Sequence, residues 1–231
     1  MWKKAMAEVI GTLFLVLIGT GAVVFGDSLL SVALAFGFIV IAMAYSIGTV
    51  SGAHMNPAVS LAMLMNGRMN FEAFLTYVGA QLVGAVAGSA ILQFILSQSG
   101  MSTANLGPTV LADGLTIAGG FFIEFLLTFL FVLVILAATG KNGDPHTAGL
   151  VIGLTLVAII LMGGTTTGIS LNPARSFGPA LLMGGAALSQ LWLYTLSTLL
   201  GGALAALIAK HVLETEAGAP GVEQEKDEVI A

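Results

Sequence analysis

The amino-acid sequence predicts an all-α integral membrane protein of six transmembrane helices plus two re-entrant half-helices, related by an inverted internal repeat. Three observations lead to this class: the composition, the number of long apolar runs, and a tripeptide that occurs twice at a fixed spacing. Of the 231 residues, 57% are hydrophobic and 8% are charged, and the mean hydropathy is +1.02. Soluble domains are about 25% charged, so most of this chain must face lipid or other apolar surface.

The apolar runs give the number of spans. A helix that rises about 1.5 Å per residue needs about 20 apolar residues to cross a hydrocarbon core of about 30 Å. Six runs approach this length, at about 5–25, 31–50, 71–97, 118–139, 148–163 and 188–210. Lys3 and Lys4 precede the first run, as basic residues do in a signal peptide, but the run is longer than a typical signal core and contains Glu8. We therefore expect it to remain as the first span.

The repeated tripeptide divides the chain into two halves. Asn56-Pro57-Ala58 recurs 116 residues later as Asn172-Pro173-Ala174. The same offset joins Glu8 to Glu124, Thr12 to Thr128, Gly37 to Gly153 and Ser60 to Ser176. A tripeptide, an acid and several small residues in one register indicate an internal duplication. We expect a single domain over 1–210, with repeat 1 at about 1–97, a linker at 98–117 and repeat 2 at about 118–210.

The basic residues predict the orientation in the membrane. With both termini on the cytoplasmic side, six of the seven Lys and Arg residues fall on that side: Lys3, Lys4, Arg68, Lys141, Lys210 and Lys226. This distribution obeys the positive-inside rule. Three spans in each half is an odd number, so the second half is inverted relative to the first. Arg175, the seventh cation, falls alone in the outer half, directly after the second tripeptide.

Each tripeptide predicts the start of a helix, because Asn is a favoured N-cap and Pro is favoured at the first helical position. The segments that follow, from Asn56 to about Asn66 and from Asn172 to about Gly184, have a length of ~16–20 Å, about half of a bilayer core. Small residues precede them at 51–55 and 167–171. One Asn-Pro could equally start a short surface helix. Two copies in one register, each flanked by full spans, favour two re-entrant loops whose helix N-termini meet near the midplane.

These residues resemble the signature loops of a known family. Ser51-Gly52-Ala53-His54-Met55-Asn56-Pro57-Ala58-Val59 and Asn172-Pro173-Ala174-Arg175-Ser176-Phe177-Gly178-Pro179 are similar to the two loops of the aquaporin (major intrinsic protein) family. The resemblance covers about 1–210 and suggests a prokaryotic water-channel-like member. It implies six tilted helices, two half-helices, one pore per subunit and a homotetramer in the cell (plasma or inner) membrane.

The chemistry of the two loops agrees with a channel that excludes cations. If the carbonyl oxygens of Asn56 and Asn172 cap their helices, we expect their NH2 groups to be free to donate to a passing oxygen. Backbone carbonyls of 51–54 and 167–170 would supply a line of acceptors. Two helix N-termini, each with roughly half a positive charge, disfavour hydronium and other cations between them, as recognised for aquaporin-type pores. Arg175 is then expected to donate to water and repel cations at the outer constriction.

The resemblance also implies which residues select the solute. Carried onto this chain, the outer constriction is formed by Phe36, Ile160, Ile169 and Arg175. Phe36 matches water channels, whereas Ile160 and Ile169 depart from the patterns of both water channels and glycerol facilitators. Ile at 160 removes a polar group and should weaken the rejection of small neutral solutes. We expect passive water flow with leakage of glycerol, hydrogen peroxide or ammonia; the alternative is a glycerol or small neutral solute facilitator.

Three polar residues are expected to support the loops. Glu8 and Glu124 are the only acids deep within predicted spans. They could act as a proton relay in an ion-coupled secondary transporter. We favour a structural role in which each accepts hydrogen bonds from the irregular backbone of a re-entrant loop. His54, inside the first loop, is assigned to the same supporting group.

Other functions are disfavoured by what the sequence lacks. There is no Cys, and the three His residues are far apart in sequence, so we expect no disulfide, metal site or cofactor. No constellation of nucleophile and base indicates an enzyme. The segment 211–231 has six acids against one Lys and accounts for the net charge of −5. It is predicted to be an acidic, disordered cytoplasmic tail, and a nucleic-acid partner has no basic surface to bind.

Overall fold

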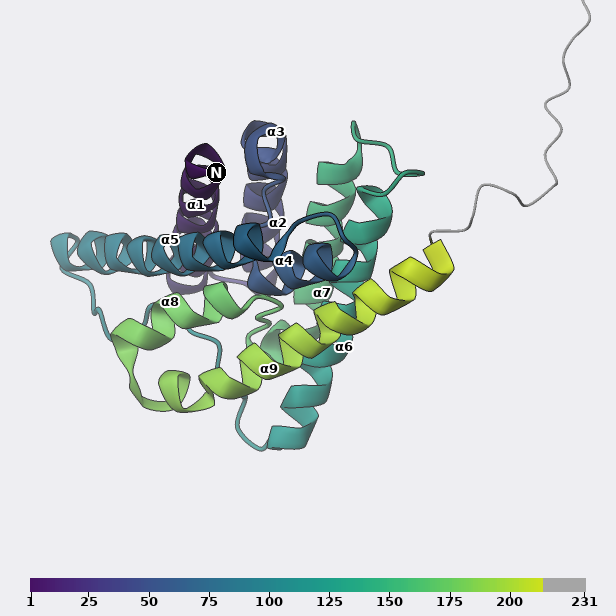
Figure 1. The fold of residues 1–231 in the computed structure, drawn as a ribbon. Coiled ribbons are helices and arrows are strands. Elements are labelled where there is room, and N and C mark those ends of the chain that lie inside the picture. Colours follow the sequence, from purple (N-terminus) through teal and green to yellow (C-terminus); the bar gives the residue numbers. More distant parts are fainter. Residues whose placement is uncertain (214–231) are drawn as a thin grey trace, which may run out of the picture.

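The computed structural model describes residues 1–213, and this part of the chain forms helices and no strands (Figure 1). Six helices are long and apolar enough to cross a membrane, as the sequence predicts. They are α1 (Trp2–Phe25), α2 (Leu29–Ser46), α5 (Phe71–Gln98), α6 (Ile117–Ala138), α7 (Ala148–Thr167) and α9 (Gly185–Ile208). A π-helical turn, Ala209–Leu213, extends α9. The rest of the predicted acidic tail, 214–231, lies outside the described residues.

Two half-length helices begin at the repeated tripeptides, which confirms this part of the predicted fold. These are α4 (Pro57–Met65) and α8 (Pro173–Met183), and a shorter helix, α3 (Gly48–Ser51), precedes α4. The side-chain oxygen of Asn56 accepts a hydrogen bond from the N–H of Ala58 at 2.9 Å. Asn172 accepts from Ala174 at 2.9 Å and from the next residue at 3.2 Å. Each Asn is thus an N-cap with Pro at the first helical position.

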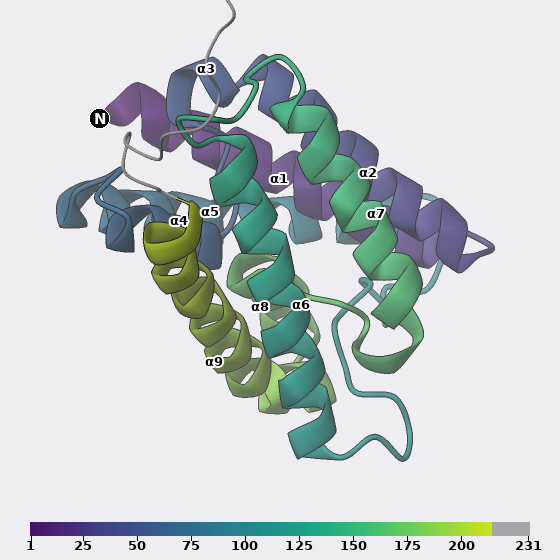
Figure 2. The ribbon, with the colours of Figure 1, turned by 90° about the vertical axis from the view of Figure 1, so that its right-hand side faces the viewer.

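The helices pack in an order that repeats between the two halves. α1 packs against α5, and α6 packs against α9 in the same way. The half-helices cross over, since α8 contacts α5 and α4 contacts α9. α2 and α7, which are related by the repeat, pack against each other, as Figure 2 shows. The two halves are therefore bound together both at the α2–α7 contact and by the exchanged half-helices.

Gly37 and Gly153 meet at the α2–α7 contact. A Cβ added to Gly37 would lie 2.8 Å from the carbonyl oxygen of Gly153, and one added to Gly153 would lie 2.6 Å from that of Gly37. The two glycines are equivalent positions of the repeat, and each faces the other's backbone. This reciprocal contact is what a two-fold axis between the halves requires.

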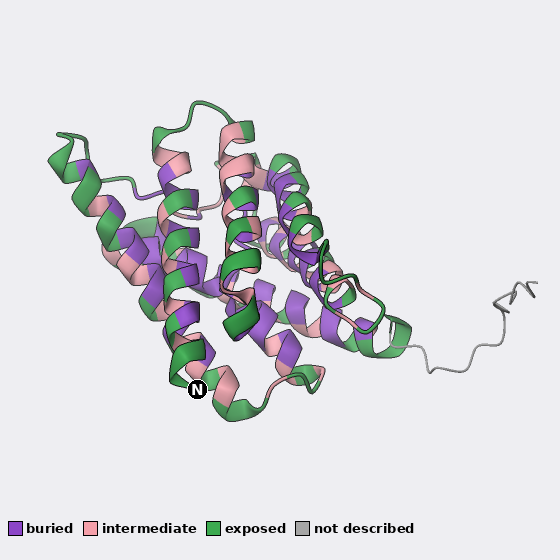
Figure 3. Ribbon diagram, turned by 90° about the horizontal axis from the view of Figure 1, so that it is seen from above, coloured by how far each residue is buried: buried purple, intermediate pink, exposed green. Residues whose placement is uncertain are grey.

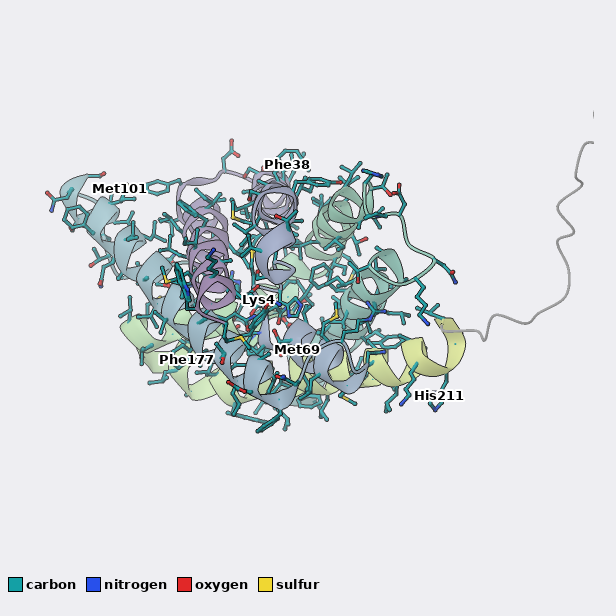
Figure 4. The ribbon with its side chains drawn as sticks, turned by 45° about the horizontal axis from the view of Figure 1, so that its top comes forward. Lys4, Phe38, Met69, Met101, Phe177 and His211 are labelled. Carbon is teal, nitrogen blue, oxygen red and sulfur yellow. The ribbon has the colours of Figure 1, made fainter. Side chains whose placement is uncertain are left out.

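The polarity of the surface is that of a protein in lipid. Large apolar side chains are exposed on the outside, including Phe94 at 63% and Met162 at 67% exposure. Polar side chains such as Gln81, Glu8 and Glu124 are fully buried. In Figure 3 the exposed stretches face outward and the buried ones lie where helices meet, and Figure 4 shows Phe38 at the rim of the molecule. An aqueous solvent would not favour this distribution.

Some helix ends differ from the predicted ones. α7 continues to Thr167, four residues beyond the apolar run that predicts it, and ends before Gly168, whose φ is +73°. Hydropathy falls over Gly163-Gly164 and the three threonines, but the helical backbone does not end there. α2 ends at Ser46, before the predicted residue 50, and the chain turns at Ile47 into α3. The apolar run 31–50 thus contains the boundary between α2 and α3, which hydropathy alone does not reveal.

A turn outside the spans connects α6 to α7 and contacts α2. Its Asp144 carboxylate accepts hydrogen bonds from the N–H of His146 and the hydroxyl of Thr147, and these bonds lower the pKa of Asp144. The Tyr45 hydroxyl donates to the carbonyl of His146 at 2.8 Å. The turn is therefore ordered locally and is attached to the end of α2.

Glycines allow the long helices to approach closely at equivalent places. A Cβ on Gly84 would lie 2.4 Å from the carbonyl oxygen of Val9, and one on Gly201 would lie 2.4 Å from that of Phe125. Gly79 also lies in α5, but nothing lies within 4 Å of a Cβ added there, so it makes no such contact within the described chain.

These glycines provide a matched test of packing within one helix. Gly84→Ala is expected to lower the free energy of unfolding by roughly 1–3 kcal/mol, because the methyl group meets backbone that cannot turn aside. Gly79→Ala is expected to be neutral or to stabilise by up to about 1 kcal/mol, through higher helix propensity. Unfolding of both variants by sodium dodecyl sulfate in mixed micelles measures the difference. Equal stability of the two variants would contradict the assigned contact.

Candidate functional site

The two loops that precede the half-helices have a strained backbone. All four non-glycine residues with positive φ in the described chain lie in these loops: Ala53 (49°), Met55 (50°), Ile169 (37°) and Leu171 (53°). Gly52 and Gly168 begin the loops with φ of +88° and +73°. Each strained non-glycine residue costs about 1–3 kcal/mol and persists only where its surroundings require it. The loops must therefore be held by groups outside them.

Glu8 on α1 binds the first loop. Its Oε1 accepts from the Ser51 hydroxyl at 2.7 Å and from the His54 N–H at 2.9 Å. Its Oε2 accepts from the Met55 N–H at 2.6 Å and from the Gln81 amide at 2.8 Å. The fully buried carboxylate thus accepts four hydrogen bonds and satisfies two backbone donors that have no helical partner.

Glu124 on α6 binds the second loop through equivalent atoms. Its Oε1 accepts from the Thr167 hydroxyl at 2.6 Å and from the Ser170 N–H at 2.9 Å, and its Oε2 accepts from the Leu171 N–H at 3.0 Å. The fourth donor is missing, because the residue that corresponds to Gln81 in the last span is Thr198, whose hydroxyl donates to the Tyr194 carbonyl within its own helix. Glu124 therefore accepts one hydrogen bond fewer than Glu8, although each loop donates three bonds to its carboxylate.

Two tyrosines bind the first carbonyl of each loop. The Tyr77 hydroxyl donates to the carbonyl of Ser51 at 2.7 Å, and the Tyr194 hydroxyl donates to that of Thr167 at 2.8 Å. The sequence-based expectation placed these two carbonyls among the acceptors of a conduit. The structure instead engages both in bonds to the protein, and neither Ser51 nor Thr167 lines the cavity described below.

The side-chain amides of the two tripeptides cross between the halves. Asn56 donates through Nδ2 to the carbonyl of Leu171, and Asn172 donates through Nδ2 to that of Met55, both at 2.7 Å. Each amide nitrogen has two protons. One is therefore engaged by the opposite loop and one remains, so the expectation that both NH2 groups are wholly free needs correction. The crossed bonds fix the direction of both amides.

A narrow cavity, here called the central cavity, runs past these amides. It is lined by the two loops, at Gly52–Asn56 and Ile169–Asn172, and by Leu15, Phe36, Val40, Ala44, Val59, Met63, Phe131, Ile135, Thr139, Ile152, Leu156, Ile160 and Arg175. Water-sized spheres can be centred in about 80 Å³ of it. One water molecule needs roughly 10–15 Å³ on this measure, so the cavity has room for a short file of water molecules.

The four residues expected to select the solute all line this cavity: Phe36, Ile160, Ile169 and Arg175. The guanidinium carbon of Arg175 lies 5.2 Å from the centre of the Phe36 ring. Its Nη1 donates to the carbonyl of Gly107 at 2.9 Å, and its Nε has no partner among the described residues. Ile160 and Ile169 add apolar surface to the same cavity. The four side chains thus combine one cation with a largely apolar wall.

The loop before α6 positions Arg175. Gly107 has a φ of +64°, and a Cβ added there would lie 2.8 Å from the carbonyl oxygen of Thr20 on α1. Nearby, Thr109 shares a hydrogen bond of 2.7 Å with Ser176, which also contacts Ser170 at 2.6 Å. The linker therefore binds α8 through the carbonyl of Gly107 and the hydroxyl of Thr109, and Ser176 continues this contact to Ser170 in the second loop.

Sequence reasoning did not find Gln81, Gly107 or the two tyrosines. A signal for the tyrosines exists, since Tyr77 and Gly84 recur as Tyr194 and Gly201 with an offset one residue longer than that of the tripeptides. A search at a single fixed offset misses them. Gly107 lies in the linker, which has no counterpart in the repeat, and nothing in its sequence context identifies its partner.

The fold and the site define a class of protein. Six apolar helices surround two half-length helices whose N-termini face one another beside a narrow cavity with polar donors at its middle. Backbone of this kind is tolerated at membrane depth only where it is buried in protein or lines a watery path. This arrangement is that of a multi-pass membrane channel.

Comparison with known proteins identifies the family. A family model described as Major intrinsic protein matches residues 1–209. The chain is 45% identical to glycerol uptake facilitator protein-like 6 of Lactiplantibacillus plantarum over 213 residues, covering 90% of this chain and 97% of that protein. It is 39% identical to aquaporin Z of Rhodopseudomonas palustris, covering 89% and 91% of the two chains. The chain belongs to the major intrinsic protein family.

A solved structure supports the fold independently of close sequence similarity. The aquaglyceroporin from Plasmodium falciparum superimposes with a TM-score of 0.84, covering 92% of this chain and 96% of that one. The identity is 22%, so this likeness concerns the fold alone. The predicted fold class, six spans with two re-entrant half-helices, is confirmed.

The different numbers of donors around Glu8 and Glu124 lead to a prediction. Glu8→Gln puts an NH2 group where an oxygen accepts two hydrogen bonds, so it is expected to lower the free energy of unfolding by roughly 3 kcal/mol. Glu124→Gln can keep its oxygen toward Thr167 and Ser170 and oppose only one N–H, so its loss should be smaller. Thermal unfolding of both variants in detergent measures this order. A larger loss for Glu124→Gln would contradict it.

Proposed function

We propose that this protein is a passive channel that conducts water down osmotic gradients and excludes ions and protons. The observation that carries the proposal is the pair of crossed amides, Asn56 and Asn172, facing a file of water-sized space at the meeting point of two helix N-termini. Relatives named aquaporin Z support water as the solute. The channel class is established by the family, and no catalytic step or cofactor is needed.

The exclusion of cations follows from fixed charges around the cavity. Each helix N-terminus has roughly half a positive charge in its first turn. The side-chain oxygens of both Asn residues are engaged in capping, so each amide can only donate to a molecule in the cavity. A central water that accepts from both amides cannot also accept a proton from its neighbours, which interrupts a proton wire, as recognised for aquaporin-type pores. Arg175 adds a full positive charge farther along.

The solute range depends on the ring formed by Phe36, Ile160, Ile169 and Arg175. With two isoleucines this ring offers few hydrogen bonds to compensate a solute that loses its hydration shell. Small neutral molecules with modest desolvation costs, such as hydrogen peroxide and ammonia, fit this chemistry along with water. A glycerol facilitator is the second candidate, and the relative named glycerol uptake facilitator protein-like 6 favours it.

The remaining features of the proposal concern assembly and orientation. We assign residues 1–210 to one channel domain in the cell membrane, with both termini cytoplasmic, because six of seven basic residues then lie on that side. We also assign a homotetramer. Glu8, Glu124 and His54 support the re-entrant loops, and no ion coupling is assigned to the two acids, since their oxygens are engaged by loop donors.

The solute can be measured directly. Purified protein in proteoliposomes is expected to shrink under an osmotic step much faster than empty vesicles in stopped-flow light scattering, with glycerol flux well below water flux. A pH-sensitive dye inside the vesicles should report no added proton leak. Shrinkage at the rate of empty vesicles would refute the water channel. Glycerol flux that rivals water flux would instead assign the chain to the facilitators.

The position of Ile169 can be tested with a single thiol, because the chain has no Cys. Mercurials are expected to leave the unmodified channel unaffected and to inhibit water flux through Ile169→Cys, since this residue lines the cavity. Leu154→Cys, at a position 49% exposed on the outside of α7, is the matched control and should stay insensitive. Unchanged flux in labelled Ile169→Cys would remove this residue from the constriction.

A further inference from the structure

The linker that binds Arg175 is itself bound by the far end of α8. Arg175, near the start of this half-helix, donates through Nη1 to the carbonyl of Gly107 at 2.9 Å. Met183, the last residue of α8, accepts at Sδ a hydrogen bond from the N–H of Leu106 at 3.3 Å. Leu106 and Gly107 are adjacent in the chain. Two long side chains from opposite ends of one half-helix therefore hold the same short stretch of the linker.

The Leu106 N–H depends on this sulfur. Leu106 is fully buried with Leu92 and Leu96 of α5, and Met183 packs against the cluster that they form. A thioether is a weak acceptor, but the Leu106 N–H makes no other hydrogen bond within residues 1–213. A buried N–H without an acceptor is costly. The Met183 sulfur therefore fixes the direction of the linker backbone at this point.

The next residue connects this contact to the outer constriction. Gly107 is closely packed, since its N–H donates to the Asn105 side chain at 2.9 Å and a Cβ added to it would lie 2.8 Å from the carbonyl oxygen of Thr20. Its own carbonyl accepts the hydrogen bond that directs the Arg175 guanidinium, whose Nε has no partner within the described residues. A displacement of Leu106 would therefore move the group that holds Arg175.

The thioether can also be modified chemically. In its reaction with hydrogen peroxide a sulfur lone pair attacks one peroxide oxygen, the O–O bond breaks and an S=O bond forms. The other oxygen leaves as water after a proton transfer, so methionine is oxidised to the sulfoxide and peroxide is reduced. An N–H···O bond needs about 2.9 Å between its heavy atoms, and the Leu106 nitrogen is only 3.3 Å from the sulfur. The new oxygen cannot enter between them, so the polar sulfoxide must displace the linker or leave the apolar cluster.

We propose that Met183 is a positioning residue for Arg175, acting through Leu106 and Gly107, and a site at which hydrogen peroxide modifies the channel. Met183 is half-buried, and the residues that follow Gly184 are exposed. In the orientation assigned above, this end of α8 lies at the outer surface, where peroxide outside the cell can reach it. The inference goes beyond the proposed function, which names the ring that selects the solute but not the groups that hold its cation in place.

The positioning contact can be measured without transport. Met183→Leu keeps an apolar side chain of similar size and removes the acceptor, whereas Met183→Gln keeps an acceptor oxygen and cannot form a sulfoxide. Hydrogen–deuterium exchange of folded channels, read by mass spectrometry on peptides that cover 104–108, is expected to be faster in Met183→Leu than in the unmodified protein. Met183→Gln should restore slow exchange. Equal exchange in Met183→Leu and the unmodified protein would overturn the proposal.

Peroxide treatment tests the modification in the same measurement. Exchange at 104–108 is expected to become faster in the treated unmodified channel and to stay slow in treated Met183→Gln. Met101→Leu is the matched control, because Met101 also lies before the linker and is 42% exposed, but its sulfur accepts no hydrogen bond from the linker. This variant should respond to peroxide as the unmodified channel does. A response that persists in Met183→Gln would refute Met183 as the site.

Transport tests the consequence for Arg175. In proteoliposomes the ratio of glycerol flux to water flux is expected to rise roughly two- to tenfold in Met183→Leu, the factor that corresponds to the loss of about one hydrogen bond. The physical reason is that a guanidinium that is no longer fixed excludes the larger solute less strictly. A ratio that does not rise in folded Met183→Leu would contradict the positioning role. If the unmodified channel conducts no water, the proposed function fails, while the exchange measurement still decides whether Met183 holds the linker.

Discussion

The structure depends on one constraint: non-helical backbone inside a membrane must have its N–H groups satisfied by the protein. The two loops before the half-helices each contain consecutive amides with no helical partner, and a buried carboxylate accepts from both. A charge is costly at this depth, and it is stable here because its hydrogen bonds are already in place. The strained backbone that precedes Asn56 and Asn172 is held by these two anchors.

The repeat explains how the halves are joined. Each half contributes a half-helix that packs against the last span of the other half, and each Asn amide donates to the opposite loop. Each loop is therefore bound in part by a side chain of the other half. Gly37 and Gly153 allow the backbones of α2 and α7 to meet on the axis that relates the halves. The two halves thus share contacts at α2–α7 and at both half-helices.

Much of this could be predicted from the sequence, because the signals are local or strictly periodic. Apolar length predicted the six spans, and Asn-Pro predicted both half-helix starts. The crossed amides could not be predicted, since each bonds to a backbone carbonyl in the other half. Tyr77 and Tyr194 escaped detection because the repeat shifts by one residue after the half-helices. Because the two tyrosines were missed, the carbonyls of Ser51 and Thr167 were expected to line the conduit, whereas each accepts a hydrogen bond from a tyrosine hydroxyl.

The two halves line the central cavity with different side chains. The scaffold is nearly two-fold symmetric, but Gln81 corresponds to Thr198 and His54 corresponds to Ser170. In the first half the Gln81 amide contacts both Glu8 and Ser60, and Ser60 contacts the ring of His54. In the second half the Ser170 hydroxyl donates to the carbonyl of Asn172, and the guanidinium of Arg175 is held by the carbonyl of Gly107 in the linker. A nearly symmetric backbone therefore holds different side chains in its two halves, while both glutamate anchors are kept.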